Sequence, residues 1–292
     1  MTVDVAALLQ GKIRHGFPDP NRRVLVMGII NVTPDSFSDG GLISDKAILL
    51  DQVAQMIENG ADIIDIGGES TRPFAPEVSV REELDRVIPA ICAVRRRFQI
   101  PISVDTVKAE VARQAIDAGA DIINDISGLS HDPAMISVAV SHDVPVIIMH
   151  MQGTPRDMQV NPRYDDVVGE ITAALASRIA WAAGKGLAKE KIIIDPGIGF
   201  GKTAAHNLTI LRNLRKFTSL GCPLLVGHSR KSFIGSILSL ADPHERDEAT
   251  AVLSALCVWN GASIIRVHDV ARTVQAVKMT LSVMNGNFPD QA

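Results

Sequence analysis

The chain has 292 residues and a net charge of −4, and 46% of its residues are hydrophobic but only 4% are aromatic. This composition suits one large globular domain, or two small ones, with an aliphatic core. Because no run of five like charges occurs and no apolar stretch is long enough to span a bilayer, we expect neither a nucleic-acid surface nor a membrane span.

The N-terminal residues MTVDVAALLQ carry an aspartate where a secretory signal peptide would carry positive charge, and no long apolar stretch follows. The three cysteines, Cys92, Cys222 and Cys257, are far apart and form no C-x-x-C pair. We interpret them as small buried hydrophobic residues. Both observations favour a cytoplasmic protein.

Three similar phrases mark junctions between a helix and a strand. They are GADIIDIGG from residue 60, GADIINDISG from residue 119 and GASIIRVHD from residue 261. Each combines a glycine suited to ending a helix, a small residue, a short β-branched run and then polar residues.

The same pattern, followed along the chain, predicts eight strands with helices between them. A capping box, Ser79 with Glu82, opens one of the helices. The predicted strands cover 24–31, 62–67, 101–105, 121–125, 144–150, 191–196, 222–229 and 263–269. The predicted helices cover 44–59, 79–97, 107–118, 132–142, 164–184, 206–217, 231–260 in two pieces, and 270–284.

Eight continuous apolar strands that alternate with helices predict a parallel sheet covered by helices. The strand number and the chain length favour an α/β fold of the closed (β/α)8 barrel type, and a doubly wound open sheet is the alternative. No Pro-rich or Ser-rich linker divides the chain. We therefore predict a single domain over residues 1–292, with the barrel proper from about 24 to 284.

In such a barrel the ligand site forms where the carboxyl ends of the strands meet, so polar residues there are candidates for function. A single Asp, Asn or Ser at a strand end more often caps the following helix. Capping does not explain Arg266 and His268, which alternate within an apolar strand and therefore point the same way. A buried cation without a partner is costly, so we expect an anion or a carboxylate to meet them.

The strand-end residues fall into two groups. Asp105, Asn124 and Asp195 offer oxygens that could accept from the donor edge of a heterocycle. The other group is cationic and suits the oxygens of phosphate or pyrophosphate, which barrels often hold at the ends of strands seven and eight. These cations are Arg72, Arg230, Lys231, Arg266 and His268.

Two familiar motifs are nearly matched. PGIGFGKT, residues 196–203, ends like a phosphate-binding Walker A loop but has proline where the first glycine is needed. No metal-binding spacing such as H-x-x-x-H occurs among His150, His206, His228 and His268. Any metal should therefore be Mg²⁺, held by oxygens and by phosphates of the substrate.

The segments MGIINVTPDSFSDGG (27–41) and GADIIDIGGESTRP (60–73) resemble the two signature segments of the dihydropteroate synthase family. SVDT, INDI, MHMQG, IDPGIGFGKT, SRKSFIG and IIRVHDV follow in the family's order, so the resemblance runs from about residue 24 to 284. It implies a (β/α)8 barrel that joins 6-hydroxymethyl-7,8-dihydropterin pyrophosphate to p-aminobenzoate in folate biosynthesis. Pyrophosphate and 7,8-dihydropteroate are the implied products, Mg²⁺ the implied cofactor, and a homodimer through outer helices the implied assembly.

The resemblance also implies a role for individual residues. The expected catalytic residues are Asp105, Lys231, Arg266 and His268. The expected pterin site comprises Asp105, Asn124, Ile126, Met149, Asp195, Phe200 and Lys231. The expected pyrophosphate site comprises Asn31, Thr71, Arg72, Arg266 and His268, with Asn31 and Asp39 as metal ligands. The expected p-aminobenzoate site comprises Phe37, Arg72, Pro73, Lys231 and Ser229.

Local chemistry agrees with this assignment. If the bond to pyrophosphate breaks before the weak aniline nucleophile arrives, positive charge develops on the pterin and negative charge on the leaving group. Arg266, His268 and Mg²⁺ would stabilise the leaving group, and Asp105 with Asp195 the pterin. We interpret residues 33–41 as a lid that brings Phe37 to the second substrate and excludes water.

Three other functions compete with this one. A pterin-binding barrel methyltransferase would share Asp105, Asn124 and Asp195 but has no use for a pyrophosphate site. A Schiff-base aldolase would use Lys231, although no apolar pocket that lowers its pKa is evident in SRKS. A non-catalytic pterin-binding homologue is the third alternative.

The sequence departs from the family pattern at two positions. Phe74 replaces a common glycine after STRP, and His228 precedes SRK where an apolar or small residue is usual. We place both near the p-aminobenzoate side of the expected site.

Overall fold

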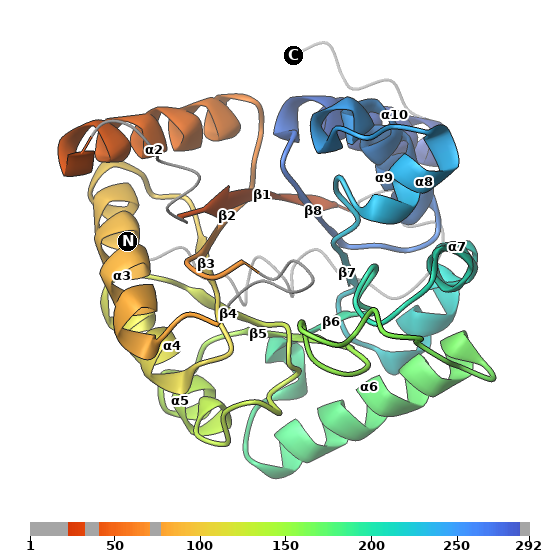
Figure 1. The fold of residues 1–292 in the computed structure, drawn as a ribbon, viewed down its shortest axis with the longest axis horizontal. Coiled ribbons are helices and arrows are strands. Elements are labelled where there is room, and N and C mark those ends of the chain that lie inside the picture. The colour runs from red at the N-terminus through yellow and green to blue at the C-terminus, as the bar shows by residue number, and fades with distance from the viewer. Residues whose placement is uncertain (1–22, 33–40, 71–76, 287–292) are drawn as a thin grey trace.

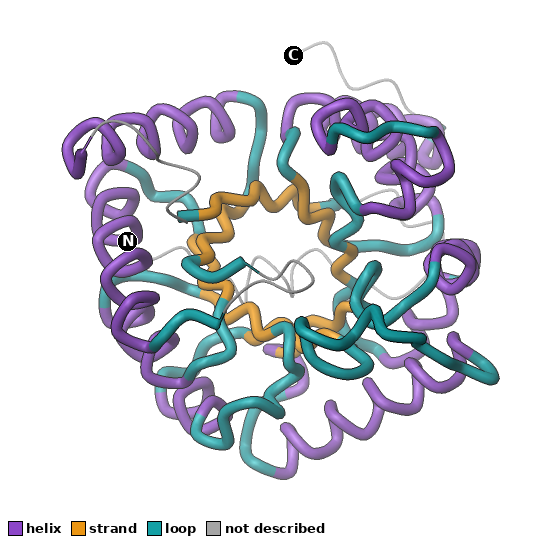
Figure 2. The backbone as a smooth tube through the Cα atoms, viewed as in Figure 1, coloured by secondary structure: helices purple, strands orange, loops and turns teal. Residues whose placement is uncertain are grey.

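The computed structural model describes residues 23–32, 41–70 and 77–286, with only the backbone described over 41–45. Eight strands form a ring, and the helices surround it (Figures 1 and 2). The strands are β1 (Leu25–Asn31), β2 (Ile63–Gly67), β3 (Ile102–Asp105), β4 (Ile122–Asp125), β5 (Val146–Met149), β6 (Ile192–Asp195), β7 (Leu225–Val226) and β8 (Ile264–Val267).

The outer layer consists mainly of α-helices. They are α2 (Gly41–Glu58), α3 (Val80–Arg97), α4 (Ala109–Asp117), α5 (Met135–Ser141), α6 (Val167–Gly184), α7 (Ala204–Arg212), α8 (Ser232–Leu238), α9 (Asp247–Trp259) and α10 (Val270–Asn285). Short 3₁₀ helices lie between them: η2 (Lys189–Lys191), η3 (Leu214–Leu220) and η4 (Pro243–Arg246).

The strand order shows that the sheet closes on itself. Neighbouring strands are parallel in the order β6-β5-β4-β3-β2-β1-β8-β7. A parallel bridge between Ile194 and Leu224 then joins β6 to β7. The predicted (β/α)8 barrel is therefore confirmed, and the open doubly wound sheet is excluded.

Strand β7 is much shorter than the predicted 222–229. Its ladder stops at Val226, and the chain turns soon afterwards: the Lys231 N–H bonds to the His228 carbonyl, and Arg230 adopts φ +58°. The side chains of His228 and Arg230 contact α9 instead of continuing the sheet. These contacts with α9 end the strand early.

The helix α3 begins where the capping box predicts. The Glu82 N–H donates to Ser79 Oγ at 3.3 Å, and the Ser79 N–H donates to Glu82 Oε2 at 3.0 Å.

Within the described part of the chain, no helix is both long and apolar enough to cross a membrane.

Alternating residues of each strand divide the core into two layers. Aliphatic residues facing the axis form a separate buried cluster, and the intervening residues pack between strands and helices. The inner cluster comprises Leu25, Met27, Ile63, Ile122, Ile147, Ile193, Leu225 and Ile264. Because side chains alternate with a period of two, the residue two positions after an inner one also faces the axis.

Candidate active site

This alternation brings polar side chains into the mouth of the barrel, at the carboxyl ends of the strands. Each of four polar residues follows an inner isoleucine by two positions, and a fifth ends β3 beside them. The five are Asp65 after Ile63, Asn124 after Ile122, Asp195 after Ile193, Arg266 after Ile264, and Asp105.

Arg266 lies at the centre of this group. Its guanidinium donates to Asp65 Oδ2 at 2.6 Å and to Asp105 Oδ2 at 2.7 Å. Asn124 Nδ2 also donates to Asp65 Oδ2, at 3.1 Å. The expectation that a carboxylate meets the strand cation is therefore confirmed for Arg266.

Sequence reasoning assigned no role to Asp65. Its side chain is fully buried, and its Oδ1 has no hydrogen-bond partner among the described residues. A buried aspartate inside the apolar strand IIDIG was the available signal, because only a cation from another strand could compensate it.

Two carboxyl groups in the mouth hold protons more tightly than usual. Burial raises the pKa of Asp105 to about 7; Arg266 opposes this shift and Asp65 adds to it. Burial also raises the pKa of Asp195 to about 6. Two groups oppose this shift: the Gly197 N–H, which donates to Oδ1 at 2.7 Å, and Lys231. Asp195 is therefore largely ionised at neutral pH, whereas Asp105 becomes largely ionised only above it.

Lys231 reaches the same mouth from the turn after β7. Its Nζ lies 4.0 Å from the centre of the Phe200 ring, and removal from water together with Arg266 lowers its pKa to about 8. The apolar surroundings that lower this pKa, which were not evident in SRKS, are therefore present in the fold.

The three predicted apolar walls of the pterin site lie together. Ile126, Met149 and Phe200 form one small buried cluster, separate from the rest of the core, and Met158 completes it. Sequence reasoning missed Met158, which stands in a loop without regular apolar spacing.

Ser229 and His268 form a pair. The His268 backbone N–H donates to Ser229 Oγ at 3.2 Å, and the same oxygen lies 2.9 Å from Nδ1 of the His268 ring. Because Oγ already accepts one hydrogen bond, its own proton can be donated to Nδ1, which places the ring proton on Nε2.

Arg230 was predicted among the cations of the site, and this is wrong. Its Nε and Nη2 donate to Asp247 of α9 at 2.7 and 2.8 Å. His228, the unusual residue before SRK, is fully buried, with Nε2 3.0 Å from the Thr250 carbonyl oxygen of α9. In this turn, His228 and Arg230 contact α9, whereas Ser229 contacts His268 and Lys231 contacts Phe200.

Asn31 ends β1 and is exposed. Among the residues that the structure describes, no group of three or more His, Cys, Asp or Glu side chains could hold a metal ion. The other predicted residues lie outside the described ranges: Phe37, Asp39, Thr71, Arg72, Pro73 and Phe74.

A second buried ion cluster, missed in the sequence, lies beside the mouth. Lys108 donates to Glu69 and to Glu83 Oε2, the latter at 2.5 Å, and Glu69 Oε1 accepts the Val78 N–H at 3.1 Å. Glu69 thus joins the two ends of the segment that contains Arg72. Although burial disfavours the charged form, the two carboxylates raise the pKa of Lys108.

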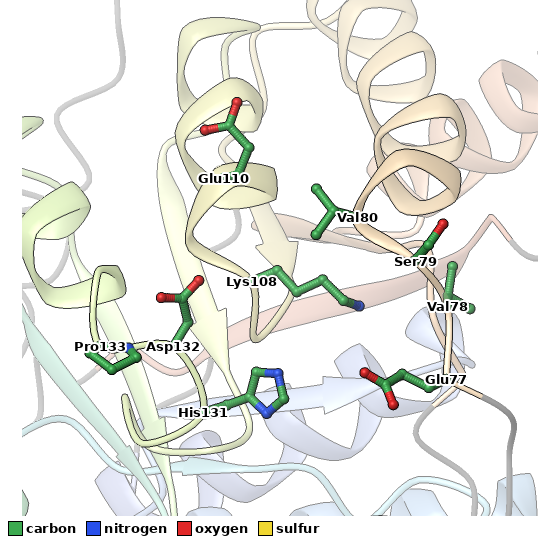
Figure 3. A pocket seen from close by; sticks show the side chains of 9 residues that line it. All are labelled: Glu77, Val78, Ser79, Val80, Lys108, Glu110, His131, Asp132 and Pro133. Atoms are coloured by element: carbon green, nitrogen blue, oxygen red, sulfur yellow. The ribbon is translucent and has the colours of Figure 1, made fainter.

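Lys108 also lines a cavity of about 310 Å³, between the start of α3 and the turns that follow β3 and β4 (Figure 3). None of the predicted site residues lines this cavity. Its lining residues are Glu77, Val78, Ser79, Val80, Lys108, Glu110, His131, Asp132 and Pro133.

The variant Lys108→Met should destabilise the fold. Removing the ammonium leaves the buried Glu83 carboxylate uncompensated, and losing one partner of a buried pair costs about 3–5 kcal/mol. Urea unfolding measures this, with Lys185→Met, at an exposed lysine, as the matched control. Equal stability of the two variants would contradict the role given to Lys108.

Comparison with known proteins places the chain among enzymes that bind pterins. The family model described as "Pterin binding enzyme" matches residues 27–268. A curated dihydropteroate synthase from Synechocystis is 50% identical over 261 residues, which is 89% of this chain and 90% of the relative.

Solved structures agree with the sequence match. The Yersinia pestis dihydropteroate synthase, in complex with a sulfonamide drug, is 44% identical with a TM-score of 0.85, covering 91% of this chain and 95% of that one. The Xanthomonas albilineans enzyme with 4-aminobenzoic acid is also 44% identical, with a TM-score of 0.84 and coverage of 89% and 93%.

Proposed function

This chain belongs to the dihydropteroate synthase family, pterin-binding transferases of folate biosynthesis, and from that premise we propose how it acts. It joins 6-hydroxymethyl-7,8-dihydropterin pyrophosphate to p-aminobenzoate by a Mg-assisted, dissociative displacement. The observation that carries this proposal is the ion cluster of the barrel mouth, in which Asp105, Asp195, Lys231 and Arg266 meet beside one apolar wall.

The pterin ring binds between acceptors and apolar walls. Asp195 and Asn124 accept from the donor edge of the ring, as buried oxygens paired with a planar N–H group do. Ile126, Met149 and Phe200 cover its faces. The Lys231 ammonium, held over the Phe200 ring, lies where it can donate to a ring acceptor.

Charge separation follows from the arrangement of the cluster. As the bond between the pterin methylene and the pyrophosphate oxygen lengthens, Asp105 and Asp195 stabilise the positive charge of the pterin. Asp65 and Asp105 fix the Arg266 guanidinium, and Ser229 fixes the His268 ring. Both side chains can therefore bind the leaving pyrophosphate without first reorganising. The p-aminobenzoate nitrogen then attacks, and pyrophosphate leaves.

The residues present fit a bound Mg²⁺. The exposed Asn31 amide ends β1 and supplies an oxygen donor of the kind that Mg²⁺ prefers, and Asp39 is a second oxygen donor in the sequence. An ion held there would neutralise charge on the leaving pyrophosphate. It would need few protein ligands, because phosphate oxygens of the substrate would supply the others.

The direct test incubates the chain with the pterin pyrophosphate, p-aminobenzoate and Mg²⁺ and follows pyrophosphate release. We expect one pyrophosphate for each 7,8-dihydropteroate formed, and loss of turnover when a chelator removes Mg²⁺. No turnover from folded protein would overturn the proposal and favour a non-catalytic homologue. Methyl transfer from a methylated pterin would favour the methyltransferase alternative.

The two substrates should be separable by mutation. Asp195→Ala removes a pair of charge-assisted hydrogen bonds, worth about 1.5–3 kcal/mol each, and should weaken pterin binding by roughly 10²–10⁴-fold. Arg72→Ala should mainly raise the KM for p-aminobenzoate. Steady-state kinetics with each substrate varied in turn distinguishes them, and equal loss of both substrates in both variants would contradict the assignments.

A homodimer is the assembly that we propose. Large hydrophobic side chains are exposed on three helices, of which α9 and α10 pack side by side (Figure 1). Apolar patches of this kind mark interaction surfaces in soluble proteins. The patch, called here the α8–α10 face, comprises Ile237, Leu238, Val252, Leu256, Trp259, Met279 and Val283.

Charge placed on this face should separate the subunits. In light scattering after size-exclusion chromatography we expect a dimer for the native chain and a monomer for Val252→Glu with Leu256→Glu. Val160→Glu, at an exposed loop valine, is the control and should stay dimeric. A native chain that elutes as a monomer at micromolar concentration would rule out the assembly.

The cytoplasmic location of the protein stays a prediction.

A further inference from the structure

The glycine-rich turn 196–203, which resembled a phosphate loop, packs against the end of β5. Gly197 and Gly201 have φ angles of +70° and +64°. A Cβ at these positions would lie 1.9 Å from the His150 carbonyl oxygen and 2.3 Å from the Gln152 carbonyl oxygen. The glycines therefore permit backbone to lie against backbone.

Lys202 lies buried inside this turn, with 2% of its surface exposed. Its Nζ donates to the Phe200 carbonyl at 2.8 Å and to the His150 carbonyl at 3.2 Å, and lies 3.2 Å from His150 Nδ1. An ammonium has three protons, and these are three acceptors. Burial, with Lys202 adding to the effect, lowers the pKa of His150 to about 3, so the imidazole is neutral and Nδ1 can accept.

Lys202 thereby joins two elements that build the barrel mouth. His150 directly follows β5, and the ring of Phe200 contacts the Lys231 ammonium. Gly199, which precedes Phe200, donates its N–H to Asn207 Oδ1 at 2.8 Å, and its carbonyl accepts from Gln159 Nε2 at 2.6 Å. The position of the Phe200 ring depends on these bonds.

The ammonium also acts on Asp195. The hydrogen-bond partners of Lys202 among the described residues are two carbonyl oxygens and a neutral imidazole, none of which cancels its charge. Burial lowers the pKa of Lys202 to about 7, and Asp195 opposes this shift. Three cations from different elements act on Asp195. They are Lys202 from the turn after β6, Lys231 from the turn after β7, and Arg266 from β8.

We propose that Lys202 is a positioning residue for the pterin: it holds the Phe200 wall against β5 and adds its buried positive charge to those of Lys231 and Arg266 near Asp195. This role rests on the proposed function, because it concerns the same pterin site. It also accounts for PGIGFGKT, whose lysine serves the architecture of the pterin pocket and binds no nucleotide phosphate.

The test compares Lys202→Met with the native chain, with Lys202→Arg and with the exposed-site control Lys185→Met. The probe is 6-hydroxymethyl-7,8-dihydropterin pyrophosphate without p-aminobenzoate, and its affinity is measured by calorimetry between pH 5 and 8. Turnover kinetics with each substrate varied provide the second readout. Circular dichroism confirms that each variant is folded.

The expected result has a defined sign. Asp195 accepts from the pterin in its ionised form, so native affinity falls as pH drops through its pKa of about 6. Removing a nearby cation raises that pKa by roughly one unit, so in Lys202→Met the fall begins at higher pH. Lys202→Arg keeps the charge and should keep the native midpoint even where its affinity is lower. The KM for p-aminobenzoate should change less than the pterin affinity in either variant.

Two results would overturn the proposal. One is a Lys202→Met chain that binds the pterin with the native affinity and midpoint, as Lys185→Met should. The other is a loss that is equal at every pH and for both substrates, which would show a purely structural lysine. Failure of turnover in the native chain would instead contradict the proposed function, while the binding measurement still decides the role of Lys202.

Discussion

The mouth of the barrel depends on one buried cation, Arg266, held between Asp65 and Asp105. Two ion pairs connect Arg266 of β8 to Asp65 of β2 and Asp105 of β3. Residues about 160 and 200 positions away in sequence therefore fix one guanidinium. A buried charge of this kind is tolerated only when its partners are close and well oriented. This requirement determines where the strand ends must lie.

The neighbouring groups extend this arrangement outward. Asn124 bonds the same Asp65 oxygen, Ser229 orients His268, and Lys202 joins the turn of Phe200 to the end of β5. Each of these side chains is set in place by contacts made before any substrate binds. Catalysis by fixed charges benefits from such preorganisation, because no reorganisation is required as charge develops.

How far the sequence predicts this structure depends on the range of each signal. Most strand positions and the Ser79 cap follow from local patterns, and these predictions were confirmed. Strand β7 was predicted too long, because the contacts of His228 and Arg230 with α9 are not local. The partners of Arg266 and Lys108 could not be predicted individually, because each pair joins residues from different strands, helices or turns. Arg230 was misplaced for a similar reason: the preference of that arginine for Asp247 depends on where α9 packs.

The proposed mechanism requires that charge separates before the nucleophile bonds, and a secondary deuterium isotope effect measures this. Deuterium would replace hydrogen at the methylene carbon of the pterin pyrophosphate, and kcat/KM would be compared for the two substrates. A cation-like transition state, stabilised by Asp105 and Asp195, predicts a clear normal effect as that carbon becomes trigonal. An effect indistinguishable from unity, with chemistry rate-limiting, would show that bond making accompanies bond breaking and would contradict the account.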